Sequence, residues 1–595
     1  MEHNPIDIPP SNKTWSEEAT AEGSRTSFMR DNLPHDKGQF ELLSEKFEKI
    51  REKDFGRLDE NGTIYLDYTG SSLAPKSLVE QHASLLISQT LGNPHSDNEP
   101  SQLATHYDHL AREKVLKFVK DDPEEYLVIW TPNASGALKL LGESYPFHRR
   151  NAYVHGPDCH NSVLGITEYA KNKKAHTGGF GFLNKSMCYD FEDYKRRLNH
   201  FGKGRTSPGL VAFPGESNSS GLKHNVAKYV KHAHEYGWDV CVDVAAYAPT
   251  TPIDIRAMGK PEYLAMSFYK IFGYPTGLGC LVLKKSAAKK LVKPWFAGGT
   301  VTFVGASKSS VVPFLHSGDD VARYEDGTGS FQSYAAVVNG IDYMTDVVDM
   351  QDLDQYISNL TEDLIKRLRN LKWSNGAPLV YIPEIEGTDE RHGHAVSMMF
   401  LSSEGTLILP SIVERELIKK NISVRIGCFC NPSSKYQMLR DRIVFPGTTY
   451  ENFVGNYLEH LKKSNLSDAD KNKIFNYYES QGMLRVSLGI ATNHKDLEAL
   501  LSCLEENILK QPQALIAESK LVGESLAKQL ESLSDYQAGR KSRPSILKKI
   551  GRNVMAQCRV TDANTMSAEE SVTSWEERHE TETSPGAFYH REVEC

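Results

Sequence analysis

The sequence has no long apolar run, no surplus of basic residues and few cysteines. A membrane-spanning helix needs about 20 consecutive apolar residues, and no stretch of the chain approaches that length. The 77 acidic residues outnumber the 69 basic ones and give a net charge of −8, which argues against a dedicated nucleic-acid binder. Nine cysteines without a regular spacing indicate a reducing compartment rather than a disulfide scaffold.

The first residues indicate where the chain works. The segment MEHNPIDIPPSNKTWSEEAT is polar and acidic. It lacks the basic and apolar regions of a secretory signal and the Arg-rich character of a mitochondrial one. We therefore expect a cytoplasmic protein with neither a membrane nor a nucleic acid as its partner.

The two ends of the chain differ from its middle. Residues 1–40 carry Pro, Ser, Asn and charges without an apolar period, so we expect a disordered arm. At the other end, residues 538–560 hold seven Lys or Arg and no acid, whereas residues 561–595 hold nine acids against two Arg. Such charge blocks are usually solvated. We expect residues 511–595 to form a helical extension and a charged disordered tail, with a binding arm or a localisation signal as the alternative.

The 595 residues exceed one typical domain of about 100–200 residues, and two domains are expected between these ends. In residues 41–340, short apolar runs such as LVIWT, LVAFP, VCVDVA and LAMSF alternate with helical stretches. This alternation predicts an α/β domain with a large, mainly parallel sheet. Residues 341–510 combine helical patterns with three strand-like runs, HAVSMMFL, NISVRIG and GMLRVSLGI, and predict a smaller α+β domain.

Asp243 and Lys270 form the most informative pair of residues. Asp243 follows an apolar run, and Lys270 follows the next such run in the segment SFYKIFGYPTGLG. Pyridoxal phosphate needs a lysine amine to bond to its aldehyde and a carboxylate to keep its pyridine nitrogen protonated. Taken singly, a surface lysine and a helix-capping aspartate would be the more common explanation.

Two further segments fit the same cofactor. A strand-like run is followed by Asn133-Ala134-Ser135-Gly136 and a helix, an arrangement suited to a phosphate; alone it is only a good helix cap. Ser267, three residues before Lys270, would add a hydroxyl. His160 lies on a loop after another run, where an imidazole could stack on the ring and move protons; a lone His is more often a surface or cap residue.

The motifs together resemble a known family. IYLDYTGSSLAP, NPHS, TPNASGALKL, DCHNSVLG, ESNSSG, SFYKIFGYPTGLG, WFAGGTV, EDGTGSF, RIGCFCNP and LRVSLG occur in this order between residues 60 and 500. They are similar to the class V aminotransferase fold, the family of cysteine desulfurases. The nearest resemblance is to the N-terminal, sulfur-mobilising part of molybdenum cofactor sulfurases. It implies a pyridoxal-phosphate-dependent transferase of fold type I.

The resemblance also implies a role for individual residues. Lys270 would hold the cofactor covalently, Asp243 would pair with its pyridine nitrogen, and His160 and Ala245 would pack on its two faces. The phosphate contacts would come from Ala134, Ser135 and Ser267. Thr300, after Gly298 and Gly299, would reach the phosphate of a partner subunit, which implies a homodimer. Asn218 would lie beside the ring and the substrate, and Arg485 would bind the substrate carboxylate.

RIGCFCNP bears on the reaction. By resemblance, Cys430 would be the nucleophile that takes sulfur from L-cysteine as a persulfide and releases alanine, and Cys428 would be either a neighbour or a resolving thiol. Two other interpretations of this pair stay open. One is a metal site, which is weak because no second Cys/His pair has zinc spacing; we expect no metal. The other is a pair of buried structural cysteines.

The chain departs from the family in two ways. Molybdenum cofactor sulfurases continue after about residue 510 into a cofactor-holding domain, whereas about 85 charged-tail residues follow here, so the sulfur acceptor stays open. Ala246 stands where many desulfurases have Gln or His, which leaves the ring hydroxyl to another donor, with Asn218 as the candidate. Three hypotheses remain. They are a cysteine desulfurase, another pyridoxal-phosphate reaction such as C–S lysis or a side-chain reaction in specialised metabolism, and a non-catalytic scaffold.

Overall fold

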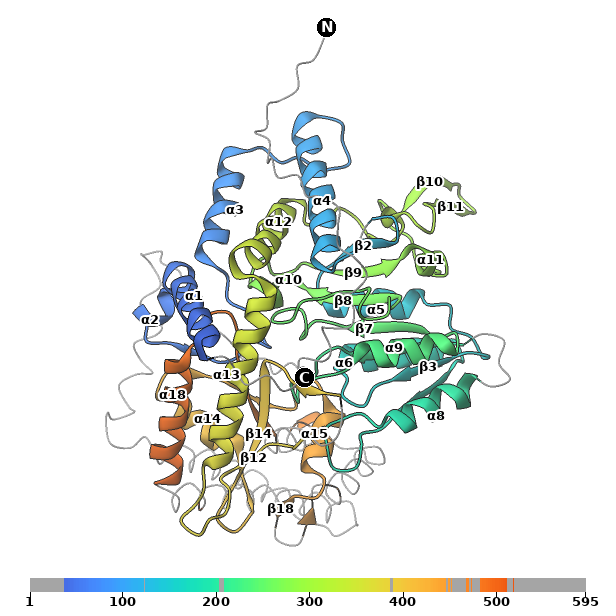
Figure 1. Cartoon of the computed structure of the whole chain (residues 1–595). Helices are drawn as coiled ribbons and strands as arrows, with labels where there is room; N and C mark the ends of the chain where they lie inside the picture. Colours follow the sequence, from blue (N-terminus) through green and yellow to red (C-terminus); the bar gives the residue numbers. More distant parts are fainter. Residues whose placement is uncertain are drawn as a thin grey trace, which may run out of the picture.

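The described part of the chain folds around two large β-sheets with helices packed on them (Figure 1). The computed structural model describes residues 37–121, 123–202, 208–385, 389–445 and 482–510, with residues 448–449, 451, 467–469, 472 and 517. The predicted arm lies outside these residues except for its last four, which begin helix α1, and the predicted tail lies outside them except for residue 517. No helix among the described residues has both the length and the apolar character of a membrane span.

The larger sheet has seven strands in the order β2-β9-β8-β7-β5-β3-β4. Their bounds are β2 (Tyr126–Thr131), β3 (Ala152–His155), β4 (His176–Gly179), β5 (Leu210–Pro214), β7 (Asp239–Asp243), β8 (Tyr263–Ser267) and β9 (Gly279–Lys284). Six of them run in one direction, and β9 is antiparallel to both of its neighbours, β2 and β8. These parallel pairs confirm the mainly parallel sheet predicted from the apolar runs. Strands β5, β7 and β8 are buried along their whole length, as their apolar runs predict.

Helices cover both faces of this sheet, as alternation along the strands requires. Cys241 of β7 packs into the cluster that includes α5 (Ala134–Ser144) and α7 (Ile166–Asn172). Its neighbours Val240 and Val242 pack into the opposite cluster, with α4 (Glu99–Phe118), α9 (Val226–Glu235) and α12 (Tyr334–Asp342). Both faces of the sheet are therefore covered by helices. Ligands of such sheets bind at the edge formed by the carboxyl ends of the strands.

The second sheet is antiparallel and belongs to the C-terminal half. It has the order β12-β14-β20-β17, with β15 beside β14. The bounds are β12 (Val380–Tyr381), β14 (Ala395–Leu401), β15 (Leu407–Ile408), β17 (Arg425–Gly427) and β20 (Met483–Ser487). Helices α13 (Met350–Asn370) and α14 (Pro410–Ile418) pack against it, and α18 (His494–Cys503) packs against these two helices.

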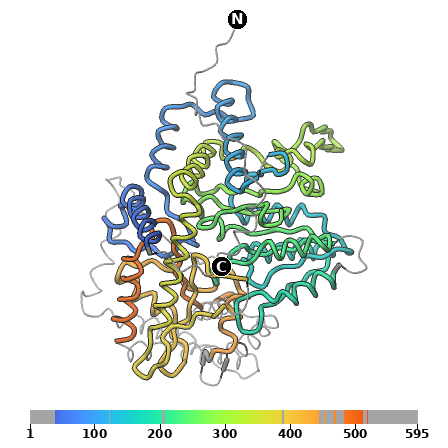
Figure 2. Tube along the Cα trace, in the orientation of Figure 1, coloured from blue at the N-terminus to red at the C-terminus, as the bar shows by residue number. Residues whose placement is uncertain are grey.

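The start of the described chain packs against its end. Figure 2 shows the first helix in blue beside the last in red. In α1 (Lys37–Phe55), Phe47 stacks on Tyr356 at 4.4 Å between ring centroids, and Arg51 pairs with Asp496 at 2.7 Å. The sequence assigned this helix to a domain of residues 41–340, and it contacts α3 (Lys76–Ser88) of that range as well as α13 and α18. The boundary at residue 340 falls within α12, and the domain limits stay predictions.

The connection after the first helices joins the two sheets. Strand β1 (Ile64–Tyr65) pairs with β16 (Ile422–Ser423), and Asp67 forms a bridge with Ser487 at the end of β20. Residues 64–67 therefore run from β16 to the end of β20 in the second sheet.

Candidate active site

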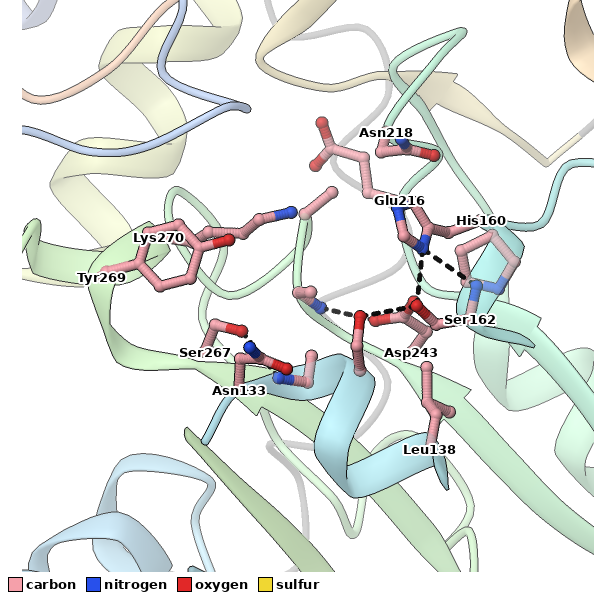
Figure 3. Close-up of a pocket in the computed structure, with 15 residues that line it drawn as sticks. Asn133, Leu138, His160, Ser162, Glu216, Asn218, Asp243, Ser267, Tyr269 and Lys270 are labelled. Atoms are coloured by element: carbon pink, nitrogen blue, oxygen red, sulfur yellow. Dashed lines mark hydrogen bonds between the residues drawn. The ribbon is translucent and has the colours of Figure 1, made fainter. Parts of the chain in front are cut away.

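A cavity lies at the carboxyl edge of the larger sheet, where ligands bind in open α/β sheets (Figure 3). Its walls come from the N-terminus of α5 and from the segments that follow β3, β5, β7 and β8. The predicted residues that line it are Lys270, Asp243, His160, Asn218, Ala245, Ala134, Ser135 and Ser267. Residues from 134 to 270 thus meet at one place, as the resemblance implied, although their individual roles stay predictions.

One end of the cavity brings amides and hydroxyls together at the N-terminus of α5. The side chain of Asn133 caps α5 by accepting a hydrogen bond from the amide of Gly136 at 2.9 Å. The amide of Ala134 donates to Ser267 Oγ at 2.8 Å, and the hydroxyls of Ser135 and Ser162 lie 2.5 Å apart. Amides and hydroxyls at the positive end of a helix dipole are suitable ligands for a phosphate.

Lys270 extends into the same cavity from the short helix α10 (Phe268–Phe272) (Figure 3). Burial lowers the pKa of its amine; Asp243 opposes this shift, and the guanidinium of Arg485 adds to it. A lowered pKa increases the fraction of neutral amine, which is the nucleophilic form. Asp243 ends the neighbouring strand β7, and its Oδ1 is fixed by the amide of Ala245 at 3.0 Å. This donor set fits pyridoxal phosphate.

His160 is held as a neutral ring. The amide of Ser162 donates to His160 Nδ1 at 3.1 Å as part of the cap of α6 (Asn161–Leu164). Because Nδ1 accepts, the proton of the neutral imidazole lies on Nε2. Burial lowers the pKa of His160; the charge of Asp243 opposes this and that of Lys270 adds to it. The ring can therefore stack on a cofactor and exchange a proton through Nε2.

Cys430 lies on a loop beside the cavity and does not line it. Phe429 and Cys430 both have left-handed backbone, with φ of 57° and 52°, which costs energy for residues other than glycine. The loop is anchored to the site at two points. Asn218 Nδ2 donates to the carbonyl of Phe429 at 2.6 Å, and the amide of Asn161 donates to the carbonyl of Cys430 at 2.8 Å. Cys428 and Cys430 are both half-buried.

Arg485 is buried next to the cavity without lining it. Its Nη1 donates to the carbonyl of Asn218 at 2.6 Å, and its Nη2 pairs with Asp67 Oδ1 at 2.9 Å. Asp67 also binds Arg425, whose Nη2 lies 2.8 Å from Oδ2. The hydrogen bond that Arg425 donates to Asp67 is the main cause that raises the pKa of Arg425. The carboxylate of Asp67 thus joins the guanidinium groups of Arg485 and Arg425. Arg425 lies just before the loop that carries Cys428 and Cys430, called here the cysteine loop.

Thr300 lies outside the cavity and is fully buried. Its Oγ1 donates to the carbonyl of Ala297 at 2.9 Å and accepts from the amide of Ala297 at 2.8 Å. The next residues form a hairpin of β10 (Val301–Ala306) and β11 (Val311–Leu315). Large apolar side chains are exposed on this hairpin, with Phe303 at 62% and Phe314 at 55%.

Several residues of the site were not predicted. Asp67 and Arg425 lie inside the quoted motifs IYLDYTG and RIGCFCNP, but no role was assigned to them. Glu216 and Ser162 line the cavity from ESNSSG and DCHNSVLG. A position inside a family motif was the available signal for all four. Asn431, which caps α15 (Pro432–Leu439) and donates to buried Asp158 at 2.7 Å, could have been found from the Asn-Pro pair, a typical helix start.

The comparison with known families decides the classification. The family model "Aminotransferase class-V" matches residues 64–500. The chain belongs to the class V aminotransferase family. It is a pyridoxal-phosphate enzyme, and the donor set in the cavity agrees with that cofactor.

Within the family, two relatives and one solved structure define the likeness. The chain is 31% identical over 491 residues to a molybdenum cofactor sulfurase of Solanum lycopersicum, covering 78% of this chain and 57% of the relative. It is 29% identical over 500 residues to that of Oryza sativa subsp. japonica, covering 78% and 58%. The chain therefore spans less than two thirds of these relatives. A cysteine desulfurase from Thermococcus onnurineus NA1 superposes with a TM-score of 0.61 at 22% identity, covering 78% of this chain and 98% of that one. The predicted fold class is confirmed.

Proposed function

We propose that this class V enzyme is a cysteine desulfurase that moves sulfur from L-cysteine to Cys430 and releases alanine. The observation that carries this proposal is the anchoring of the Cys430 loop to Asn161 and Asn218, which places a thiol-bearing loop at the edge of the Lys270 cavity. In the proposed step, the Cys430 thiolate attacks the substrate sulfur. The S–S bond forms as the C–S bond breaks, and the carbon skeleton takes up protons and leaves as alanine.

The cavity residues would divide the remaining work. Bound pyridoxal phosphate would supply an electron sink for the α-carbon. Lys270, released from the cofactor by the substrate, would remove the α-proton, since its lowered pKa favours the neutral amine. Asp243 would keep the pyridine nitrogen protonated, and His160 would pass protons through Nε2. Ala134, Ser135 and Ser267 would hold the phosphate.

The substrate carboxylate would bind at Arg485. Arg485 and Arg425 carry two positive charges, whereas Asp67 supplies one negative charge between them. Arg485 is buried, whereas the side chain of Arg425 is 51% exposed. An anion bound beside Arg485 would be attracted by the positive charge that Asp67 leaves unmatched. The α-carboxylate of an amino acid is such an anion, and Asn218 beside Arg485 would orient the rest of the substrate.

We also propose a homodimer in the cytoplasm. The apolar hairpin of β10 and β11 begins directly after Thr300, and exposed patches of this kind are typical of protein interfaces. A second copy covering it would bring Thr300 toward the neighbouring phosphate site. A reducing compartment would keep the thiol of Cys430 able to carry sulfur, which then passes to an acceptor.

The test is product analysis. The purified holoenzyme is given L-cysteine and a thiol reductant, and alanine, sulfide, pyruvate and ammonia are measured. The proposal predicts alanine and sulfide in equal amounts, and their loss in Cys430→Ser but not in Cys503→Ser, which alters a thiol in α18. Pyruvate and ammonia formed by a Cys430→Ser variant would instead identify a C–S lyase.

A further inference from the structure

Glu216 is a buried carboxylate in the wall of the catalytic cavity. It follows β5, two residues before Asn218, and is 1% exposed. Figure 3 shows Glu216 and Asn218 at the end of the cavity opposite Asn133 and Ser267, with Lys270 between the two ends. Because Asn133 and Ser267 belong to the phosphate end, Glu216 lies at the end that is left for the substrate.

One oxygen of Glu216 is fixed by the second sheet. Oε1 accepts a hydrogen bond from the amide of His394 at 3.0 Å and lies 2.6 Å from His394 Nδ1. The opposite ring nitrogen of His394 lies 3.0 Å from Thr69 Oγ1. Gly393 completes this support, since a Cβ at that position would overlap the Glu216 carboxylate. The orientation of the carboxylate is therefore determined by residues outside the cavity wall.

The other oxygen, Oε2, is buried and has no hydrogen-bond partner among the described residues. A buried acceptor without a donor is costly, most of all when it belongs to a charged group. The described residues contain another buried Glu–His pair, Glu390 with His224 at 3.0 Å, and that pair does not line the cavity. What distinguishes Glu216 from Glu390 is therefore its position in the cavity wall. A molecule bound in the cavity is the available source of a hydrogen-bond donor for Oε2.

We propose that Glu216 is a specificity-determining residue of this site. Its Oε2 accepts a hydrogen bond from the side chain of the bound amino acid. The site therefore favours an amino acid whose side chain is neutral and carries an S–H or O–H group, and it disfavours one with an anionic side chain, because two like charges in a buried cavity repel. The inference rests on the proposed function, since it takes an amino acid as the substrate.

The test uses two amino acids that carry no sulfur. The holoenzyme is titrated with L-serine and with L-aspartate, and binding is followed by the change in cofactor absorbance. We expect L-serine to bind at least about tenfold more tightly, and Glu216→Gln, which keeps the shape and an oxygen for His394, to reduce that ratio by about tenfold or more. Glu390→Gln is the matched control and should keep the wild-type ratio.

Two results would overturn the inference. If wild-type holoenzyme binds L-aspartate as tightly as L-serine, Glu216 does not select against anions, and this holds even where the variant fails to fold. If Glu216→Gln keeps its melting temperature, its cofactor absorbance and the wild-type ratio of L-serine to L-aspartate affinity, Glu216 serves only to hold its own segment against His394. Neither result depends on sulfur transfer to Cys430, so failure of the desulfurase assay is distinguishable from failure of this inference.

Discussion

The amide of Asn161 donates a hydrogen bond to the carbonyl of Cys430 at 2.8 Å. The two residues are far apart in sequence, and Asn161 follows His160, whose ring lines the cavity. This bond and the one from Asn218 to Phe429 attach the cysteine loop to the site that the parallel sheet builds. A change in either anchor should therefore affect sulfur transfer without removing the cofactor.

Asn218→Ala tests this connection, because it removes the donor to Phe429. We expect alanine formation to fall by about 10- to 100-fold, as the loop loses a defined position and a misplaced group slows the reaction strongly. Stopped-flow measurement of alanine formation, with cofactor absorbance recorded in parallel, would check this. Asn375→Ala, at an exposed turn that bonds Ser403, is the control. Unchanged turnover in Asn218→Ala would contradict the role given to the hydrogen bond between Asn218 and Phe429.

Lys270→Ala should abolish the absorbance of the lysine-bound cofactor and reduce turnover by about 10²- to 10⁴-fold or more, since both the covalent link and the base are lost. Absorbance spectra and steady-state kinetics measure both effects. Lys366→Ala, an exposed position on α13, should change neither. Survival of the absorbance in Lys270→Ala would show that another amine holds the cofactor.

His160 should stay neutral at pH 7. Burial lowers its pKa below the ordinary value of about 6.5, so between the two values only the unfolded chain binds the proton, and stability rises with pH through that range. We expect NMR titration of the His160 ring to give a midpoint below pH 6.5, and the acid limb of kcat to follow it. A midpoint above pH 7 would contradict the neutral ring.

Arg485→Lys should raise the KM for L-cysteine by about tenfold or more and change kcat less. An ammonium cannot bond both Asp67 and the carbonyl of Asn218 while also meeting a carboxylate in a fork. Steady-state kinetics would separate the two parameters. Arg51→Lys disturbs another buried Arg–Asp pair, with Asp496, and should lower the melting temperature without moving KM. An unchanged KM in Arg485→Lys would place the carboxylate elsewhere.

The exposed hairpin predicts a dimer. Light scattering should show a dimer for the native chain. The double variant Phe303→Ser and Phe314→Ser should shift it toward monomer, because the proposed interface loses two exposed apolar rings. Ile418→Ser, which changes another exposed apolar side chain at 58% exposure, should leave the dimer intact. A monomeric native chain would exclude the role proposed for Thr300.

The parts that could be predicted from the sequence are those with a local signal. Strands β5, β7 and β8 read as continuous apolar runs because they are buried on both faces. Asp243 is the last residue of β7, and Lys270 lies in the short helix after β8. The antiparallel direction of β9 had no such signal, since its apolar run resembles those of the parallel strands. The contact of α1 with α18 also had none, because Arg51 meets Asp496 only in the fold.

The same distinction applies to the site. Asp67 and Glu216 were missed because their importance comes from long-range partners: Asp67 joins Arg425 and Arg485, and Glu216 is oriented by His394. A lone Asp or Glu in a motif gives no indication of such partners. Arg485 was assigned from the resemblance, but its bonds to Asp67 and Asn218 appear only in the structure.

Mass spectrometry of the sulfur carrier tests the central claim most directly. Holoenzyme is mixed with L-cysteine, trapped with an alkylating reagent and digested, and the peptide that contains Cys428 and Cys430 is analysed. The account predicts one additional sulfur atom on Cys430, formed together with one alanine per site. An unmodified Cys430 in an enzyme that consumes L-cysteine would contradict it.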